Sequence, residues 1–268
     1  MSSARDLTLT LYGRFLRERG SWIAISHLVR LLEPLGADPA STRSAISRLK
    51  RDGLLDADER SGLAGYALTP AGDAFFADGD RRIFDQPNED GVAWVLASFS
   101  VPEAERNLRY RIRATLLDLG FGQLGNGLLI APAARLDEAA RRLQRERLAD
   151  RTRLWRAEHG PLGRLADVVT EAWDLDTIRE RYDAVERLTR RPIPATLSDA
   201  DAFERHVAAI DAWRAARYAD PGLPNRVMGP GWPEPFARDA FARLDEALRP
   251  RSIAHLDATA PQPKRSPV

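Results

Sequence analysis

The sequence predicts a mostly helical α+β fold in three parts. Residues 5–86 contain three amphipathic helices, a hairpin and a fourth helix, residues 91–160 alternate between strands and helices, and residues 161–249 have a helical pattern. The last residues, 250–268, contain four prolines and few hydrophobic side chains, so we expect a disordered tail there. A length of 268 residues suggests about two domains, with one or three also possible, and is enough to bury a sizeable core.

Helical spacing of apolar residues predicts three helices in the first part. The first covers about residues 5–19 and ends at Gly20, and the second is capped by Ser26 and ends at Gly36. The third covers about residues 40–52, with apolar residues on one face and charged or hydroxyl residues on the other.

A hairpin and a fourth helix complete this part. Residues 54–55 and 66–68 are suited to two short strands, and the polar, glycine-containing segment between them is typical of a hairpin tip. Thr69 followed by Pro70 is a common helix start, and we expect a helix from there to Phe84. Helix, helix, helix, hairpin, helix is the order of a winged helix-turn-helix domain.

The third helix has the chemistry of a DNA-recognition helix, which in such domains enters the major groove. Residues 41–52 contain four cations and one acid, a net charge of +3. Arg can donate two hydrogen bonds to guanine, and hydroxyl groups bind bases or phosphate. A helix N-terminus also favours phosphate, so we expect Ser41 and Thr42 to bind the DNA backbone. The predicted contacts to double-stranded operator DNA are Ser41, Thr42, Arg43, Ser44, Ser47, Arg48, Lys50, Arg51 and, in the hairpin, Arg60.

The distribution of charge leaves an alternative open. The net charge is +1 for residues 1–84, +4 for 91–160 and −1 for 161–268, and the acidic linker between the first two segments accounts for the rest. A charged run is usually a solvated face, so the first part could instead be a non-catalytic protein-interaction module. If it binds DNA, we expect weak non-specific affinity, because few phosphates would be neutralised per subunit.

Turn-forming residues at 85–91 mark the first domain boundary. Strand and helix patterns then alternate over 91–160, with room for one more strand near residues 122–124, and this order predicts a ferredoxin-like domain. The expected elements are a strand at 94–101, a helix at 103–119, a strand at 127–131, a helix at 135–147 and a strand at 151–156.

Residues 161–249 are expected to form a helical C-terminal domain. Pro192-Ile193-Pro194 and the Pro- and Gly-rich segment 220–235 interrupt the helical pattern. The expected helices cover about residues 173–188, 199–217 and 236–248.

The composition excludes several classes of function. The chain has no Cys and only four His, far apart in sequence, which rules out thiol chemistry and Cys-ligated zinc and argues against a metal site. No dinucleotide-binding, P-loop or nucleophile-elbow motif supports an enzyme or a bound cofactor. No stretch reaches the roughly 18–20 apolar residues of a membrane span, and the N-terminus lacks signal-peptide features. We therefore expect a cytoplasmic protein with no membrane partner.

Short motifs occur along the chain in the order of a known family. They are Leu9–Gly13, Ser44–Leu49, Leu68–Gly72, Arg81–Phe84, Trp94 with Phe99–Glu103, Leu119–Gly122, Ala172–Leu175, Asp220–Pro224 and Gly231–Pro233. No single motif is specific, but together, over about residues 5–248, they resemble the PaaX family of transcriptional repressors, known from phenylacetic acid catabolism.

The resemblance implies a winged helix, a middle domain similar to Cas2 proteins, and a helical C-terminal domain. It also implies a homodimer on palindromic operator DNA that an aryl-CoA thioester releases. We therefore expect a repressor of a catabolic operon whose effector is an aromatic acid or its CoA thioester. The sequence departs from the family at Asp211-Ala212, where the family has a His-Glu-like pair, so the effector can differ.

Residues suited to such an effector lie in the second and third parts. Three arginines at helical spacing, beginning at Arg106, could hold phosphates or touch DNA, although a solvated helix face is the simpler interpretation. Tryptophans could line an aromatic pocket or belong to the core. The effector candidates are Arg106, Arg109, Arg113, Trp155, Trp173, His206, Trp213 and Arg214.

The resemblance to Cas2 proteins also raises the possibility of a metal-dependent nuclease. Such chemistry needs carboxylates at a strand end to hold the ion. The first strand of the middle domain is followed by no acid before Glu103, which disfavours this activity.

Overall fold

The structure, a computed structural model, describes residues 3–85 and 93–261. Apart from Asp85, the predicted linker at 85–91 lies outside these residues, as does the segment 262–268 of the predicted tail. No helix in the described ranges is both long and apolar enough to cross a membrane.

The chain divides into two compact units. The first contains the described residues of 1–81, 184–213 and 236–268, and the second those of 82–183 and 214–235. The predicted third domain, 161–249, is therefore divided between the units. Three long helices contribute to both: α8 (Leu175–Thr189), α9 (Asp199–Ala219) and α11 (Glu234–Thr259).

Residues 3–81, the first part of the first unit, are called the N-terminal module. It begins with a helical segment whose hydrogen-bond pattern changes along its length. α1 (Ala4–Leu11) continues as a π-helix over Tyr12–Leu16 and as a 3-10 turn over Arg17–Arg19. Gly20 then ends the segment with a φ of +88°, a left-handed conformation that glycine adopts without steric cost. The helix predicted for 5–19 is confirmed, whereas its π-helical middle was not predicted.

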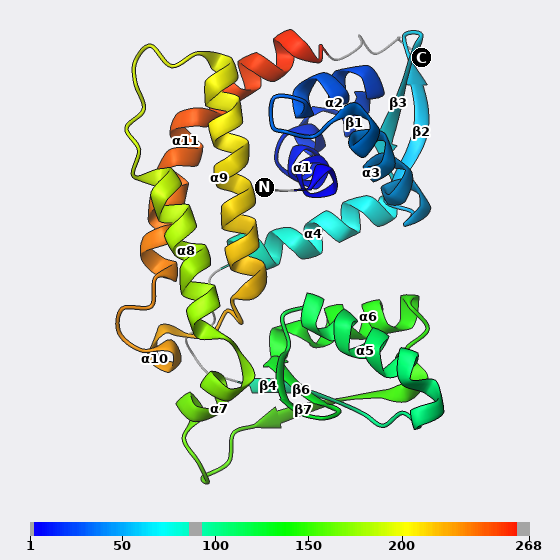
Figure 1. The fold of residues 1–268 in the computed structure, drawn as a ribbon, viewed down its shortest axis with the longest axis vertical. Helices are drawn as coiled ribbons and strands as arrows, with labels where there is room; N and C mark the ends of the chain where they lie inside the picture. The colour runs from blue at the N-terminus through cyan, green and yellow to red at the C-terminus, as the bar shows by residue number, and fades with distance from the viewer. Residues whose placement is uncertain (1–2, 86–92, 262–268) are drawn as a thin grey trace. The chain divides into compact units, whose positions relative to one another are not determined.

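Two further helices and a three-stranded sheet complete the core of the module (Figure 1). α2 (Ile25–Leu32) and α3 (Pro39–Arg51) bury the apolar faces that their sequences predict. A fully buried strand, β1 (Trp22–Ala24), pairs with β3 (Leu63–Leu68), which pairs with β2 (Leu55–Arg60), and both pairings are antiparallel. The sequence did not indicate β1, because three residues are too few to show a strand period.

The hairpin is longer than predicted. The segment 56–65, expected to be a polar tip, is mostly strand, and only Ser61 and Gly62 turn the chain. Both have positive φ angles, 51° and 75°, as a two-residue hairpin turn requires. β2 is charged and largely exposed, so it lacks the hydrophobic alternation on which the prediction depended. α4 (Pro70–Phe84) then begins at the predicted position.

The second unit contains a four-stranded antiparallel sheet in the order β5-β6-β4-β7. Its elements are β4 (Ala93–Phe99), α5 (Arg106–Asp118), β5 (Gly122–Gly125), β6 (Leu128–Pro132), α6 (Leu136–Arg145) and β7 (Thr152–Glu158). This is the ferredoxin-like order, and β5 is the additional strand expected near 122–124. Val95 and Ala97 of β4 and Ile112 and Leu116 of α5 share one core, so the helices cover one sheet face.

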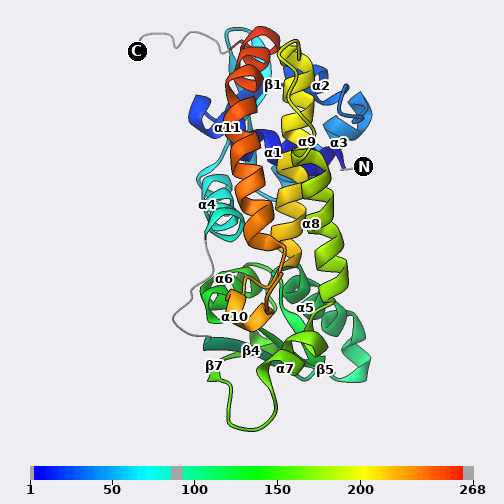
Figure 2. The same ribbon diagram turned by 90° about the vertical axis from the view of Figure 1, so that its left-hand side faces the viewer.

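The C-terminal helices follow the sheet. α7 (Leu165–Ala172) precedes α8, and the short α10 (Asn225–Met228) lies in the predicted loop. α8, α9 and α11 run side by side in both views (Figures 1 and 2). Trp213 of α9 stacks on Phe241 of α11 with ring centroids 5.3 Å apart, which fixes these two helices together.

The predicted disordered tail is wrong over residues 250–259. α11 continues through Pro250 to Thr259, although the prediction ended this helix near Leu248. Ser252 and Leu256 are buried, and the Ser252 hydroxyl donates a hydrogen bond to the Leu248 carbonyl at 2.9 Å. The free energy gained by packing this part of α11 therefore outweighs the loss of the one backbone hydrogen bond that a proline removes from a helix interior.

Candidate nucleic-acid interface

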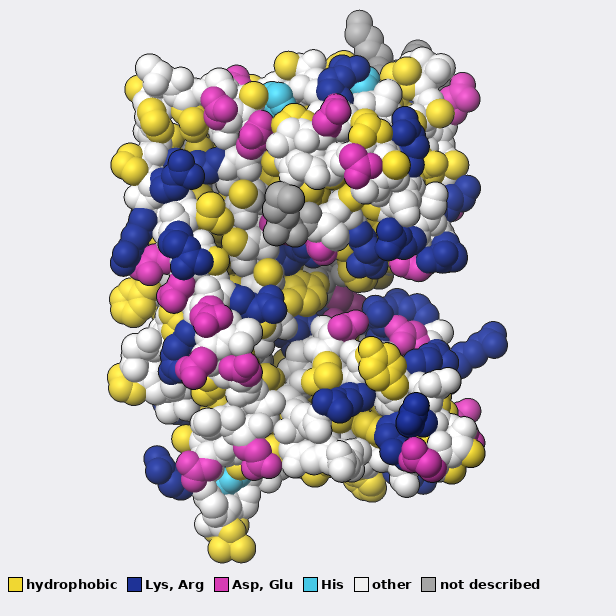
Figure 3. Space-filling view, viewed as in Figure 1, with side chains coloured by type: hydrophobic (Ala, Val, Ile, Leu, Met, Phe, Trp, Pro, Cys, Tyr) yellow, Lys and Arg dark blue, Asp and Glu magenta, His cyan; other side chains and the backbone are white. Residues whose placement is uncertain are grey.

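The two faces of α3 differ sharply in chemistry. Thr42, Ala45, Ile46 and Leu49 are buried in the module, which confirms the predicted apolar face. The other face is exposed to solvent and carries Ser41, Arg43, Ser44, Ser47, Arg48, Lys50 and Arg51. Elsewhere on the surface seen in Figure 3, basic and acidic side chains are interspersed.

The exposed cations of α3 are not neutralised by nearby carboxylates. Arg48 lies along the helix, where its Nη2 donates to Ser44 Oγ at 3.1 Å. Arg43 approaches the Pro39 carbonyl at 3.4 Å. Among residues 3–85 and 93–261, Lys50 and Arg51 have no ion-pair partner. These groups can therefore bind an anion without first breaking an internal ion pair.

The N-terminus of α3 is already capped. Asp38 Oδ1 accepts hydrogen bonds from the backbone N–H groups of Ala40 and Ser41, both at 2.9 Å. Ser41 Oγ donates to Asp38 Oδ2 at 2.5 Å, and this bond, with the backbone bonds, lowers the pKa of Asp38. A carboxylate therefore occupies the place predicted for phosphate. The side chain of Thr42, the other predicted backbone contact, is fully buried, so its hydroxyl does not face solvent.

The hairpin holds Arg60 against the module. Its Nε donates to Asp58 at 2.8 Å, and its guanidinium lies 5.3 Å from the centroid of the Trp22 ring. Asp56 and Glu59 lie on the same strand, so β2 carries three acids and one cation. The hairpin has the wrong charge to attract a phosphate, and Arg60 would have to leave its partners to reach one.

The effector candidates of the middle domain lie on opposite sides of its sheet. Arg106, Arg109 and Arg113 belong to α5, on the helix-covered face. Trp155 alternates with the core residue Leu154 and so lies on the other face, where its Nε1 donates to Ser98 at 3.0 Å. Arg109 forms an ion pair with Glu103, the first acid after β4, at 3.2 Å.

Two of the candidate tryptophans are core residues. The Trp173 ring centroid lies 6.3 Å from that of Trp94, and its Nε1 donates to the Gly120 carbonyl at 3.1 Å. Trp213 is buried against Phe241, and Arg214 follows it in α9. The core interpretation of Trp173 and Trp213 is confirmed by their burial, whereas Trp155 is more than half exposed.

His206 belongs to a buried polar cluster that the sequence did not reveal. Its Nδ1 lies 2.9 Å from Ser252 Oγ, and its Nε2 lies 2.9 Å from Asp245 Oδ1. Arg14, in the π-helical segment, forms an ion pair with the same carboxylate. Burial raises the pKa of Asp245, but hydrogen bonds from His206 and Arg14 outweigh burial and lower it to about 2.

The fold and the site together define a class: an α+β protein that joins a helical module with a basic, exposed helix to a ferredoxin-like domain and long C-terminal helices. Comparison with models of known protein families identifies the family within this class. The models match in chain order, as "PaaX-like protein" over residues 3–72, "PaaX protein central Cas2-like domain" over 87–169 and "PaaX-like protein C-terminal domain" over 173–258. The chain belongs to the PaaX family.

Two individual proteins are similar over nearly the whole chain. "Transcriptional repressor PaaX" of Escherichia coli (strain K12) is 26% identical over 264 residues, which cover 94% of this chain and 82% of that protein. The solved structure of "Uncharacterized protein Rv0674 from Mycobacterium tuberculosis" matches with a TM-score of 0.54 and 21% identity. That match covers 96% of this chain and 98% of the other, and it shows a shared fold.

Proposed function

We propose that this protein is a transcriptional repressor that binds double-stranded operator DNA through α3. The exposed basic face of α3 carries the proposal, because it presents cations and hydroxyl groups on a helix whose other face is anchored in the core. The name of the Escherichia coli relative supports the same function. In this proposal the N-terminal module is a winged helix-turn-helix domain with α3 in the major groove.

The proposal assigns different roles to the residues of α3. Arg43 and Arg48 would donate to guanine, and Ser44 and Ser47 would bind bases or phosphate. The other predicted contacts in α3 are Ser41, Lys50 and Arg51. The acidic hairpin would not contact the phosphate backbone of the DNA, so base contacts by α3 would carry most of the specificity.

A homodimer and a small-molecule effector complete the proposal. Two copies related by a two-fold axis would place their α3 helices in successive major grooves of a palindromic operator. An aromatic acid or its CoA thioester would release the DNA by binding preferentially to a form of the dimer that does not fit the operator. Analytical ultracentrifugation tests the dimer directly.

Fluorescence anisotropy tests the DNA contact with duplexes that tile the region upstream of the protein's own gene. Arg48→Ala should weaken binding to the best duplex by about 1–3 kcal/mol at constant salt. Lys50→Ala should weaken binding to all duplexes alike. It should also reduce the slope of log affinity against log salt concentration by about 1, the change expected for the loss of one phosphate contact. Arg81→Ala is the control, because it removes an exposed cation from α4 instead of α3.

Two results would contradict the proposal. One is the absence of any upstream duplex that binds more tightly than unrelated DNA of equal length. The other is equal affinity of the wild type and the Arg48→Ala variant while both keep the same melting temperature.

A further inference from the structure

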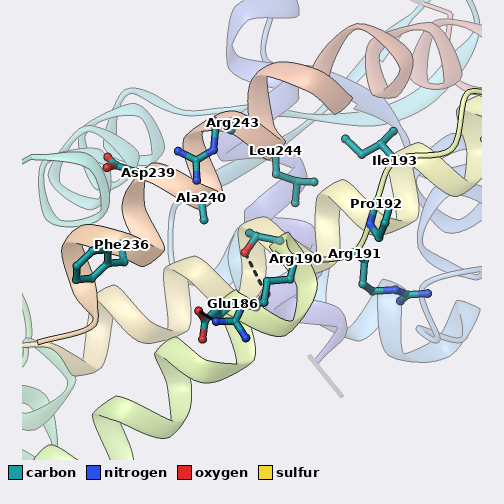
Figure 4. A pocket seen from close by; sticks show the side chains of 11 residues that line it. Glu186, Arg190, Arg191, Pro192, Ile193, Phe236, Asp239, Ala240, Arg243 and Leu244 are labelled. Atoms are coloured by element: carbon teal, nitrogen blue, oxygen red, sulfur yellow. Dashed lines mark hydrogen bonds and ion pairs between the residues drawn. The ribbon is translucent and has the colours of Figure 1, made fainter. Parts of the chain in front are cut away.

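A cavity of about 650 Å³ opens between the end of α8 and the first turns of α11. Figure 4 shows that α11 forms one wall and α8 the other, and that the segment after α8 closes one end. All of its lining residues lie in the first compact unit, which also contains the N-terminal module. The lining includes charged side chains from both helices and the apolar residues Ile193, Phe236 and Leu244.

Two of the three arginines that line the cavity have no paired acid among the described residues. Arg190 is paired with Glu186 at 2.5 Å, so these two charges offset each other. Arg243 and Arg191 have no ion-pair partner within the described ranges. Asp239 also contributes to the lining, but Figure 4 shows its carboxylate directed away from α8. An anion would therefore gain more from this cavity than a cation.

Apolar side chains border the same cavity. Phe236 is 73% exposed and Ile193 is 39% exposed, which is high for large hydrophobic residues, while Leu244 is buried. Exposed apolar groups beside a cavity gain free energy when the body of a ligand covers them. The cavity thus combines an arginine with an uncovered apolar surface, as small-molecule sites do.

We propose that this cavity binds a small carboxylate with an aromatic or aliphatic body. The carboxylate would accept two hydrogen bonds from the guanidinium of Arg243, the geometry that arginine favours for this group. The body of the ligand would pack against Phe236, Ile193 and Leu244. The volume lies within the range of roughly 300–1,000 Å³ that is usual for such sites.

The position of the cavity couples it to the N-terminal module. Leu244 in its wall precedes Asp245, whose carboxylate binds both Arg14 and His206. A ligand that moves this turn of α11 therefore changes the contact between α11 and the π-helical segment next to α1. This consequence rests on the proposed function, because it makes the ligand a regulator of DNA affinity.

Fluorescence titration with 8-anilinonaphthalene-1-sulfonate, an aromatic anion, tests the site in the full-length protein. The dye should bind saturably, and 3-phenylpropanoate should displace it while the matched cation 3-phenylpropylamine should not. Arg243→Ala should weaken the binding of the dye and of 3-phenylpropanoate by about tenfold or more, and Arg243→Lys should restore part of the lost affinity. Arg187→Ala, which removes an exposed arginine of α8 that does not line the cavity, should leave both unchanged.

Dye binding that is equal in wild type and Arg243→Ala would overturn the site, as would displacement by the amine as effective as displacement by the carboxylate. DNA binding separates this proposal from the proposed function. The Arg243→Ala variant should bind the duplex like the wild type, but 3-phenylpropanoate should no longer change its DNA affinity. The Arg48→Ala variant should lose DNA binding and still bind the carboxylate. If no variant binds DNA but the carboxylate still requires Arg243, the site stands and the repressor function fails.

Discussion

The carboxylate of Asp245 accepts a hydrogen bond from Nε of Arg14 at 3.0 Å, although the two residues are 231 positions apart in sequence. Nη2 of the same arginine bonds the second carboxylate oxygen, so the contact is a two-pronged ion pair. The side chains are only 21% and 15% exposed. A shielded pair of this geometry is stronger than a surface ion pair and ties α11 to the N-terminal helical segment.

Removing this carboxylate should strongly destabilise the protein. Asp245→Ala leaves Arg14 and His206 facing each other without an anion, and we expect a loss of about 3 kcal/mol in the free energy of unfolding, measured by urea denaturation. Arg249→Ala removes an exposed pair with Glu18 that joins the same two segments, and it should cost less than about 1 kcal/mol. Equal losses in the two variants would show that burial of the first pair has no energetic weight.

The same pair predicts how stability depends on acid. Because the pKa of Asp245 falls from 3.8 to about 2 in the folded protein, its ionised form stabilises the fold above about pH 4. That contribution, about 2 kcal/mol, should disappear as the pH falls through about 2. Urea denaturation of wild type and Asp245→Asn over this range isolates it from other carboxylates. A difference between the two proteins that stays constant with pH would refute the assignment.

Thr42→Val should leave DNA binding unchanged. Thr42 Oγ1 is buried without a hydrogen-bond partner among the described residues, so valine of similar shape removes an unsatisfied polar group. We expect the free energy of unfolding to stay equal or to rise by up to about 1 kcal/mol. Anisotropy and urea denaturation check both parts, and weaker operator binding would restore Thr42 as a backbone contact.

Gly65→Ala should destabilise the N-terminal module. A Cβ at this position of β3 would lie 2.5 Å from the Ile23 carbonyl oxygen and 2.6 Å from the Trp22 ring. Neither neighbour can move without separating β1 from β3, so we expect a cost of about 1–3 kcal/mol. Gly125→Ala is the control, because nothing lies within 4 Å of its Cβ, and thermal melting of both variants should show a loss only at Gly65.

The parts of the site that could be predicted are those that depend on local spacing. Ala45, Ile46 and Leu49 recur at helical intervals, and this pattern alone determines which face of α3 meets solvent. The capping role of Asp38 was missed because Ser41 has the same preference for a helix N-terminus. The contacts of Arg60 with Asp58 and Trp22 depend on how the strands pair. The sequence did not predict this pairing, because the charged hairpin lacks a hydrophobic alternation.

By itself, the sequence determined the order of most helices and strands, the basic face of α3 and membership of the PaaX family, because each is recorded in short-range patterns. Only the tertiary structure decided that α11 passes Pro250, that Arg14 meets Asp245, and that a cavity opens beside Arg243. These features join residues from distant elements. Their energies depend on burial and packing between helices, which local spacing does not encode.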